Sequence, residues 1–194
     1  MRNPLEYQVT EYDCVPTTFI NAIRYLFGRN EIPPEVVKSI YMFSLDTFNR
    51  RGKSGKRGSS FYAVQHICNW LNEYSQGNDF GIYCDLLEPS DIHLAKNSRI
   101  IECLNEGGAA VVRVYFTKSL YHYVLITEID DEFAYVFDPY YREKDFKEDD
   151  IEIVFDKPFK YNRKIKRVWI DSTEKKKYAL SDNNERECVL VYRT

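Results

Sequence analysis

Cys14 is the first residue of the sequence whose type and place suggest chemistry. It lies in the stretch YQVTEYDCVPTTFINAIRYLF, in the first turn of a predicted helix. The N-terminus of a helix presents unpaired N–H groups and a partial positive charge, and both favour the thiolate, which is the nucleophilic form of cysteine. The alternative role is that of a core thiol, because free cysteines commonly pack as small hydrophobic residues. Position alone leaves both roles open.

A nucleophilic cysteine needs a general base, and the sequence contains three histidines. His93 lies in a polar, loop-like stretch and His66 in the middle of a predicted helix, whereas His122 opens the apolar strand SLYHYVLITEI. His122 is therefore the best placed to serve as the base. Its alternative role is that of an ordinary strand histidine whose hydrogen bonds are satisfied.

Asp138 is the candidate orienter of the imidazole, sixteen residues after His122 on the next predicted strand. If residues 130–132 form a three-residue turn, the register pairs Val124 with Asp138. His122 and Asp138 are then diagonal neighbours on one face, about 7–8 Å apart between backbones, and their side chains can meet. A two-residue turn would shift the register by one and put the pair on opposite faces. The alternative role of Asp138 is to form the turn before Pro139.

Three helices are predicted in the first half of the chain from apolar residues spaced three and four apart. The first runs from Cys14 to Gly28, a natural stop, and tolerates Pro16 in its first turn. The second begins at residues 32–34 and runs to about Phe48. The third follows the loop that ends at residue 60, and its apolar face includes Cys68, which we expect to be a core thiol.

Beyond Gly81 the pattern predicts strands, because β-branched and aromatic residues dominate. The segments are GIYCDLL, AAVVRVYF, LYHYVLITEI and EFAYVFDPYY, with a short helix at 100–105 and a final strand ECVLVYR. Helices followed by antiparallel strands are typical of the α+β class, in which N-terminal helices pack on a C-terminal antiparallel sheet. A chain of 194 residues can bury one proper core, so we expect a single domain over residues 1–194.

Composition argues against several classes of function. The net charge is −3 with both signs mixed along the chain, so the basic face that nucleic-acid binding requires is missing. No apolar run fits a signal peptide or a membrane span, and we expect a soluble, cytoplasmic protein without a membrane partner. Five cysteines at irregular spacing favour free thiols. The paired short spacings of a zinc site are missing, and we expect neither a metal nor another cofactor.

The basic loop (residues 50–60), RRGKSGKRGSS, carries five positive charges and no negative charge. Its Gly and Ser content predicts a mobile linker between the second and third helices. The alternative is that the loop reaches the cleft and steers an acidic substrate toward it.

The order of these residues resembles that of the papain-like cysteine peptidases. The closest branch is that of the bacteriocin-leader-processing peptidases, family thirty-nine of the cysteine peptidases. The matching features are Gln8 six residues before Cys14, Asp13 directly before it, the histidine strand HYVLIT and the later FDPYY, over residues 8 to about 141. The sequence departs from the family at Val15, where the family usually has glycine. A side chain there would narrow the cleft or mark a loss of peptide cleavage.

The resemblance implies a papain-like fold and a set of catalytic residues. Cys14 would be the nucleophile, His122 the general base and then the acid, and Asp138 the group that holds the imidazole. Gln8 would form the oxyanion hole with the backbone N–H of Cys14, since its amide donates without titrating. The leader-processing enzymes are fused to a transporter, of which the sequence shows no segment, and Gln8 comes too early for a propeptide. The resemblance therefore does not imply a double-glycine leader as the substrate.

The sequence thus predicts a cysteine hydrolase that cleaves peptide or isopeptide amides through a Cys14 thioester, with a peptide or protein as substrate. Acyl transfer or deamidation by the same triad is the alternative within enzymes. The alternative outside enzymes is a pseudo-peptidase that binds peptides, for which Val15 is the hint. Thiol reactivity separates the two, because a binding module has no reason to hold Cys14 as a thiolate. The oligomeric state is left open.

Overall fold

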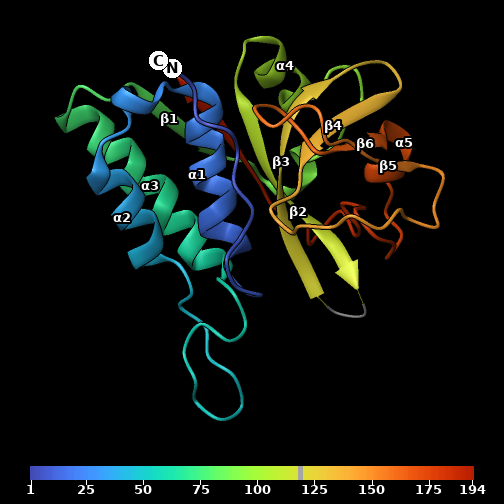
Figure 1. Ribbon diagram of the computed structural model, residues 1–194, viewed down its shortest axis with the longest axis horizontal. Coiled ribbons are helices and arrows are strands. Elements are labelled where there is room, and N and C mark those ends of the chain that lie inside the picture. The colour runs from blue at the N-terminus through green and yellow to red at the C-terminus, as the bar shows by residue number, and fades with distance from the viewer. Residues whose placement is uncertain (118–119) are drawn as a thin grey trace.

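A layer of helices packs against one side of a sheet in the computed structural model, which describes residues 1–117 and 120–194. The helical layer lies on the left in Figure 1 and the sheet on the right. Its members are α1 (Cys14–Leu26), α2 (Pro34–Phe43) and α3 (Phe61–Gly77). Shorter helices connect the strands or follow them: η1 (Arg29–Glu31), η2 (Pro89–Asp91), α4 (Arg99–Asn105) and α5 (Arg167–Ile170).

The described residues form a seven-stranded sheet of order β1-β7-β2-β3-β4-β6-β5, in which all neighbouring strands are antiparallel. The strands are β1 (Ile82–Leu86), β2 (Ala109–Thr117), β3 (Leu120–Ile129), β4 (Phe133–Phe137), β5 (Ile151–Ile153), β6 (Arg163–Lys166) and β7 (Cys188–Arg193). The chain is therefore mixed α+β, with the helices first and an antiparallel sheet second, as the sequence predicts.

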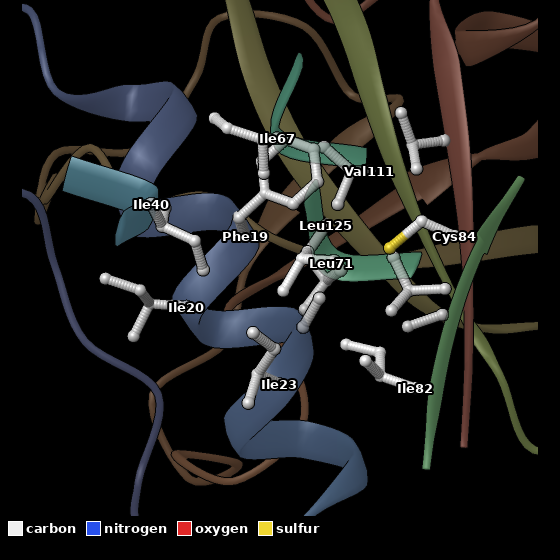
Figure 2. Close-up of a cluster of buried hydrophobic side chains, with 14 of the residues drawn as sticks. Phe19, Ile20, Ile23, Ile40, Ile67, Leu71, Ile82, Cys84, Val111 and Leu125 are labelled. Carbon is white, nitrogen blue, oxygen red and sulfur yellow. The ribbon is translucent and has the colours of Figure 1, made fainter. Parts of the chain in front are cut away.

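One hydrophobic cluster joins the helical layer to the sheet, as Figure 2 shows. Phe19 of α1, Ile40 of α2 and Ile67 of α3 meet there with Val111 of β2 and Leu125 of β3. All five side chains are at most 1% exposed. Burial of this kind contributes about 1.5–3 kcal/mol for each large aliphatic or aromatic side chain, so the cluster holds α1 firmly against the central strands.

A second cluster covers the opposite face of the sheet. Val112 of β2 and Val124 of β3 pack there with Ile100 of α4, Ile170 of α5 and Leu180. The central strands are therefore buried on both faces, and this explains why AAVV and YVLIT occur as continuous apolar runs rather than as alternating patterns.

One helix boundary and two strands differ from the sequence expectations. The second helix ends at Phe43 and not near Phe48, because the Ser44 hydroxyl bonds to the Ile40 carbonyl at 2.6 Å and Leu45 takes a left-handed φ of 56°. Strands β5 and β6 were not expected in the charged C-terminal third. They pair at the edge of the sheet, where alternate residues face outward and tolerate charge.

Among the described residues, no helix combines the length and the apolar character needed to cross a membrane.

Candidate active site

Cys14 begins α1, as the sequence predicts, and differs from the other cysteines in its exposure. All five cysteines lie in the described part of the chain and are free; Cys14 is half-buried, while Cys68, Cys84, Cys103 and Cys188 are buried. The expectation that Cys68 is a core thiol is thus confirmed. Cys14 is the thiol that a substrate can approach.

A hydrogen bond between the two layers places Cys14 beside β3. The Thr18 hydroxyl donates to the backbone carbonyl of Tyr123 at 3.0 Å, in a fully buried position. The paired residues of β3 and β4 begin at Leu125, so β4 does not cover this carbonyl. Thr18 lies one helical turn after Cys14 on the same face of α1, and Tyr123 follows His122 directly. The bond therefore holds the start of α1 against the part of β3 that carries His122.

His122 and Asp138 form a buried pair. Nε2 of His122 lies 2.6 Å from Oδ1 of Asp138, and the two residues are 5% and 0% exposed. The predicted contact between these two side chains is confirmed. An imidazole held in this way presents its other nitrogen, Nδ1, in a fixed direction.

The turn that leads to this contact differs from the predicted one. Ile129 pairs with Ala134 rather than with Phe133, because the Asp130 carboxylate accepts the backbone N–H groups of Glu132 and Phe133 and closes a longer turn. The three-residue turn is therefore wrong. A register shift between Ile126 and Glu128 inserts one extra residue and restores the predicted register before the strand reaches His122.

The electrostatics of the pair favour charge on both partners. Burial alone lowers the pKa of His122, but the charge and hydrogen bond of Asp138 outweigh it, with a further contribution from Cys14, and the pKa is raised. Burial raises the pKa of Asp138, but the charge and hydrogen bond of His122, with the charge of Arg163 and the hydrogen bond of Tyr178, lower it overall. The site therefore favours an imidazolium next to a carboxylate near neutral pH.

Cys14 lies near enough to His122 to contribute to the raised pKa of the imidazole. Because Nε2 is occupied by Asp138, Nδ1 is the nitrogen left to face the sulfur. Thiol, imidazole and carboxylate thus stand in the order that a nucleophile, a base and an orienting group require. Such a set can transfer a proton from the thiol and attack an acyl carbon.

Three further residues support Asp138, and sequence reasoning missed them all. The Tyr178 hydroxyl donates to Oδ2 of Asp138. The side chain of Asn162 bonds both the N–H and the carbonyl of Asp138, at 2.7 and 2.8 Å. Arg163, 1% exposed, donates to the carbonyls of Asn162 and Tyr140 and places a positive charge near the carboxylate. Tyr178 takes a φ of 64°, a left-handed conformation that costs a bulky residue about 1–2 kcal/mol.

Gln8 lies next to the turn that follows Asp138. Its backbone N–H bonds to the carbonyl of Pro139 at 2.8 Å, and its Nε2 donates to the carbonyl of Thr10 at 2.7 Å. Asp13 fixes the intervening loop, because its carboxylate accepts the N–H and the hydroxyl of Thr10. Nε2 carries a second N–H, so Gln8 keeps one donor for an oxyanion. The described contacts do not join the Gln8 side chain to Cys14 directly.

Val15 is 1% exposed and packs within the cluster between the helices and the sheet. Its side chain therefore belongs to the core beneath the first turn of α1. Val15 therefore places no side chain on the solvent-facing side of this turn.

A pocket of about 430 Å³ adjoins β3 on the side of the helical layer. Its walls include Phe61, the first residue of α3, and Tyr121, the residue before His122. Arg113 contributes a charge there and pairs with Glu187 at 2.6 Å. Side chains of neighbouring strand residues point to opposite faces of a sheet, so this pocket lies on the face of Tyr121, and neither Cys14 nor His122 lines it.

In the described part of the chain, no group of three or more His, Cys, Asp or Glu side chains is gathered in a way that could hold a metal ion. Comparison with protein-family models and with curated proteins finds no match to the chain. The function is therefore inferred from the geometry of the site.

Proposed function

We propose that the protein is a papain-like cysteine hydrolase that cleaves peptide or isopeptide amide bonds. The observation that carries this proposal is the buried His122, with Asp138 on Nε2 and Cys14 acting on the same ring. A structural histidine needs only ordinary backbone or side-chain partners for its two ring nitrogens. An imidazole set between a carboxylate and the most accessible thiol of the chain fits catalysis better.

The reaction begins with the Cys14 sulfur attacking the carbonyl carbon of the amide. The carbonyl becomes an oxyanion, and the backbone N–H of Cys14 is a donor for it, because first-turn N–H groups have no intrahelical partner. His122 then gives its proton to the leaving amine as the C–N bond breaks, and a thioester on Cys14 remains. His122 takes a proton from water, which attacks the thioester and releases the acid and the Cys14 sulfur.

The Gln8 amide is the proposed second donor to the oxyanion. Its backbone bond to Pro139 keeps it beside the turn that holds Asp138, and Asp13 keeps the loop between Gln8 and Cys14 closed. Removal of one donor of this kind costs about 2.7–4 kcal/mol in the barrier.

Selective alkylation of Cys14 tests the proposal without knowledge of the substrate. Native protein is treated with iodoacetamide between about pH 6 and pH 9, and each cysteine is quantified by mass spectrometry. The four buried cysteines serve as internal controls. Cys14 should react fastest well below pH 8, and His122→Ala should remove this advantage. If Cys14 reacts no faster than the buried thiols at any pH, the proposal is wrong.

Cleavage is then measured on a mixture of peptides that includes lysine ε-linked isopeptides. The parent protein should produce fragments that Cys14→Ala does not produce. Added glycinamide distinguishes the alternative reaction, because acyl transfer would join glycinamide to the acyl fragment in place of water. A reactive Cys14 without any Cys14-dependent product from the mixture would favour the peptide-binding module.

A further inference from the structure

Hydrogen bonds with residues 47 and 49 connect the two arms of the basic loop (residues 50–60). Gly55 donates to the carbonyl of Thr47 at 2.7 Å, and the Thr47 hydroxyl donates to the carbonyl of Gly58 at 2.6 Å. Asn49 donates to the carbonyl of Lys53 at 3.1 Å across the tip. These bonds close an irregular hairpin, so the loop is more than a featureless linker between α2 and α3.

The loop returns to the main body beside the nucleophile. Nζ of Lys56 lies 5.5 Å from the centre of the Tyr12 ring, and a Cβ on Gly58 would lie 3.5 Å from the Tyr12 carbonyl. Gly58 has a φ of 79°, which other residues rarely adopt. Tyr12 stands two residues before Cys14 in the sequence. One side of the loop is thus packed against the segment that leads into α1.

The other end of the loop leads into α3. Ser60 caps α3, and Phe61 follows it as a wall of the pocket that Tyr121 also lines. In Figure 1 the loop projects from the same end of the molecule at which α1 begins, while the chain termini lie at the opposite end. Because Lys56 and Gly58 lie against Tyr12, a peptide bound across Cys14 would lie near the loop.

The charges of the loop are free to act on such a peptide. Its five cations are exposed, and none forms an ion pair with another described residue: Arg50, Arg51, Lys53, Lys56 and Arg57. Exposed aromatic side chains flank them, with Phe48 68% and Tyr62 77% exposed. The loop is a positive surface on a protein whose net charge is −3.

We infer that the basic loop binds an acidic segment of the substrate, so that the preferred substrates are peptides rich in Asp or Glu. This inference rests on the proposed function, which makes the ligand beside Cys14 a peptide chain. A peptide is favoured over a nucleic acid because the reaction proposed for Cys14 breaks an amide bond, and competition with oligothymidine tests the alternative.

Binding is measured on the full chain with Cys14→Ala, so that the probe is not consumed and the result does not depend on turnover. The probe is a fluorescein-labelled peptide of about twelve residues in which Glu alternates with Ala and Phe. Its reference has Gln in place of each Glu. Fluorescence anisotropy at about 50 mM and about 300 mM NaCl gives both affinities, since screening shortens the reach of charge from roughly 14 Å to 6 Å.

The Glu peptide should bind about tenfold tighter than the Gln peptide at low salt, because each exposed ion pair contributes only a few-fold. Changing Lys53, Lys56 and Arg57 to Gln should bring the two affinities close to each other. The control changes Lys144, Lys147 and Lys175 to Gln, three exposed cations with the same total charge that lie far along the chain from the loop. The control should keep the preference for the Glu peptide.

Three results would overturn the inference. They are equal affinities for the two peptides, an equal loss of preference in both triple variants, and displacement of the Glu peptide by oligothymidine of similar length at equal or lower concentration. The last result would identify a nucleic-acid site. The binding assay does not depend on the reactivity of Cys14, and the alkylation test does not depend on the basic loop. A failure of one proposal can therefore be distinguished from a failure of the other.

Discussion

Replacing Asp138 by Asn removes one charge from the site and keeps its shape. Oδ1 of Asp138 accepts two bonds, from Nε2 of His122 at 2.6 Å and from the backbone N–H of Tyr140 at 2.7 Å. If the new amide turned its nitrogen toward this position, that nitrogen would face the N–H of Tyr140 as a second donor. The amide oxygen therefore stays there, and His122 keeps the tautomer with hydrogen on Nε2. The substitution isolates the effect of the charge.

The magnitude follows from the geometry of the pair. Two unit charges about 4 Å apart interact by about 4 kcal/mol at an effective dielectric constant of about 20. Loss of this interaction in the imidazolium form corresponds to at most about 10³-fold in rate. In a serine protease triad, where the same change of Asp to Asn also traps the wrong tautomer, the loss is about 10⁴-fold. We therefore expect the alkylation rate of Cys14 near pH 7, and kcat/KM on any peptide that the parent cleaves, to fall by about 10² to 10³.

The same substitution should reverse the pH dependence of stability. The pKa of His122 is raised in the folded protein above its ordinary value of about 6.5, so its stabilising effect is complete below pH 6.5 and is lost as the pH rises through the folded pKa. In Asp138→Asn the negative charge that raises the pKa of His122 is gone, so burial lowers this pKa. The stability that depends on this group is then lost as the pH falls through about 6.5.

The assay is thermal unfolding followed by circular dichroism between about pH 5 and pH 9, with Tm compared at each pH. The control is Asp131→Asn, an exposed aspartate in the turn between β3 and β4. The difference in Tm between the variants should become smaller as the pH rises above 7. A constant difference at all pH values, together with unchanged alkylation of Cys14, would refute the electrostatic role of Asp138.

Other substitutions test the supports of the site. Thr18→Val leaves the buried carbonyl of Tyr123 without its partner, so it should lower the free energy of unfolding by about 1–3 kcal/mol in a denaturant titration. It should also slow the alkylation of Cys14, and unchanged labelling would contradict the positioning role of Thr18. Tyr178→Phe removes one donor from Asp138, which should raise the pKa of that carboxyl and move the acidic limb of activity to higher pH; an unmoved limb would count against it. Gln8→Ala should lower kcat by about 10²-fold while labelling of Cys14 continues at the parental rate, and equal turnover would remove Gln8 from the oxyanion hole.

The helices and strands that depend on local patterns could be predicted from the sequence. Cys14 at the start of a helix and the order of the strands follow from apolar spacing and β-branched content, which act over a few residues. The contact of His122 with Asp138 could also be predicted, because the two residues are carried by one hairpin. Its predicted turn was wrong, however, and the contact survives because the register shift after Ile126 compensates for the longer turn.

The supports of Asp138 could not be predicted, because they come from distant parts of the chain. Asn162 and Tyr178 are separated from Asp138 by 24 and 40 residues, and the intervening segment is highly charged with short edge strands. The path of the chain through the whole sheet decides which distant residues form hydrogen bonds with Asp138. Arg163 gave no signal in advance, because neither its burial nor the strand β6 that carries it was expected from the sequence.

The bond from Thr18 to Tyr123 also determines how the protein should fail under stress. Cys14, the proposed nucleophile, belongs to the helical layer, whereas His122 and Asp138 belong to the sheet side of the molecule. The proposed catalytic set is therefore assembled across the boundary between the layers. A small sliding of α1 along β3 would separate sulfur from imidazole while both layers stayed folded. Catalysis should therefore report on the docking of the layers, and inactivation on warming should precede the loss of secondary structure.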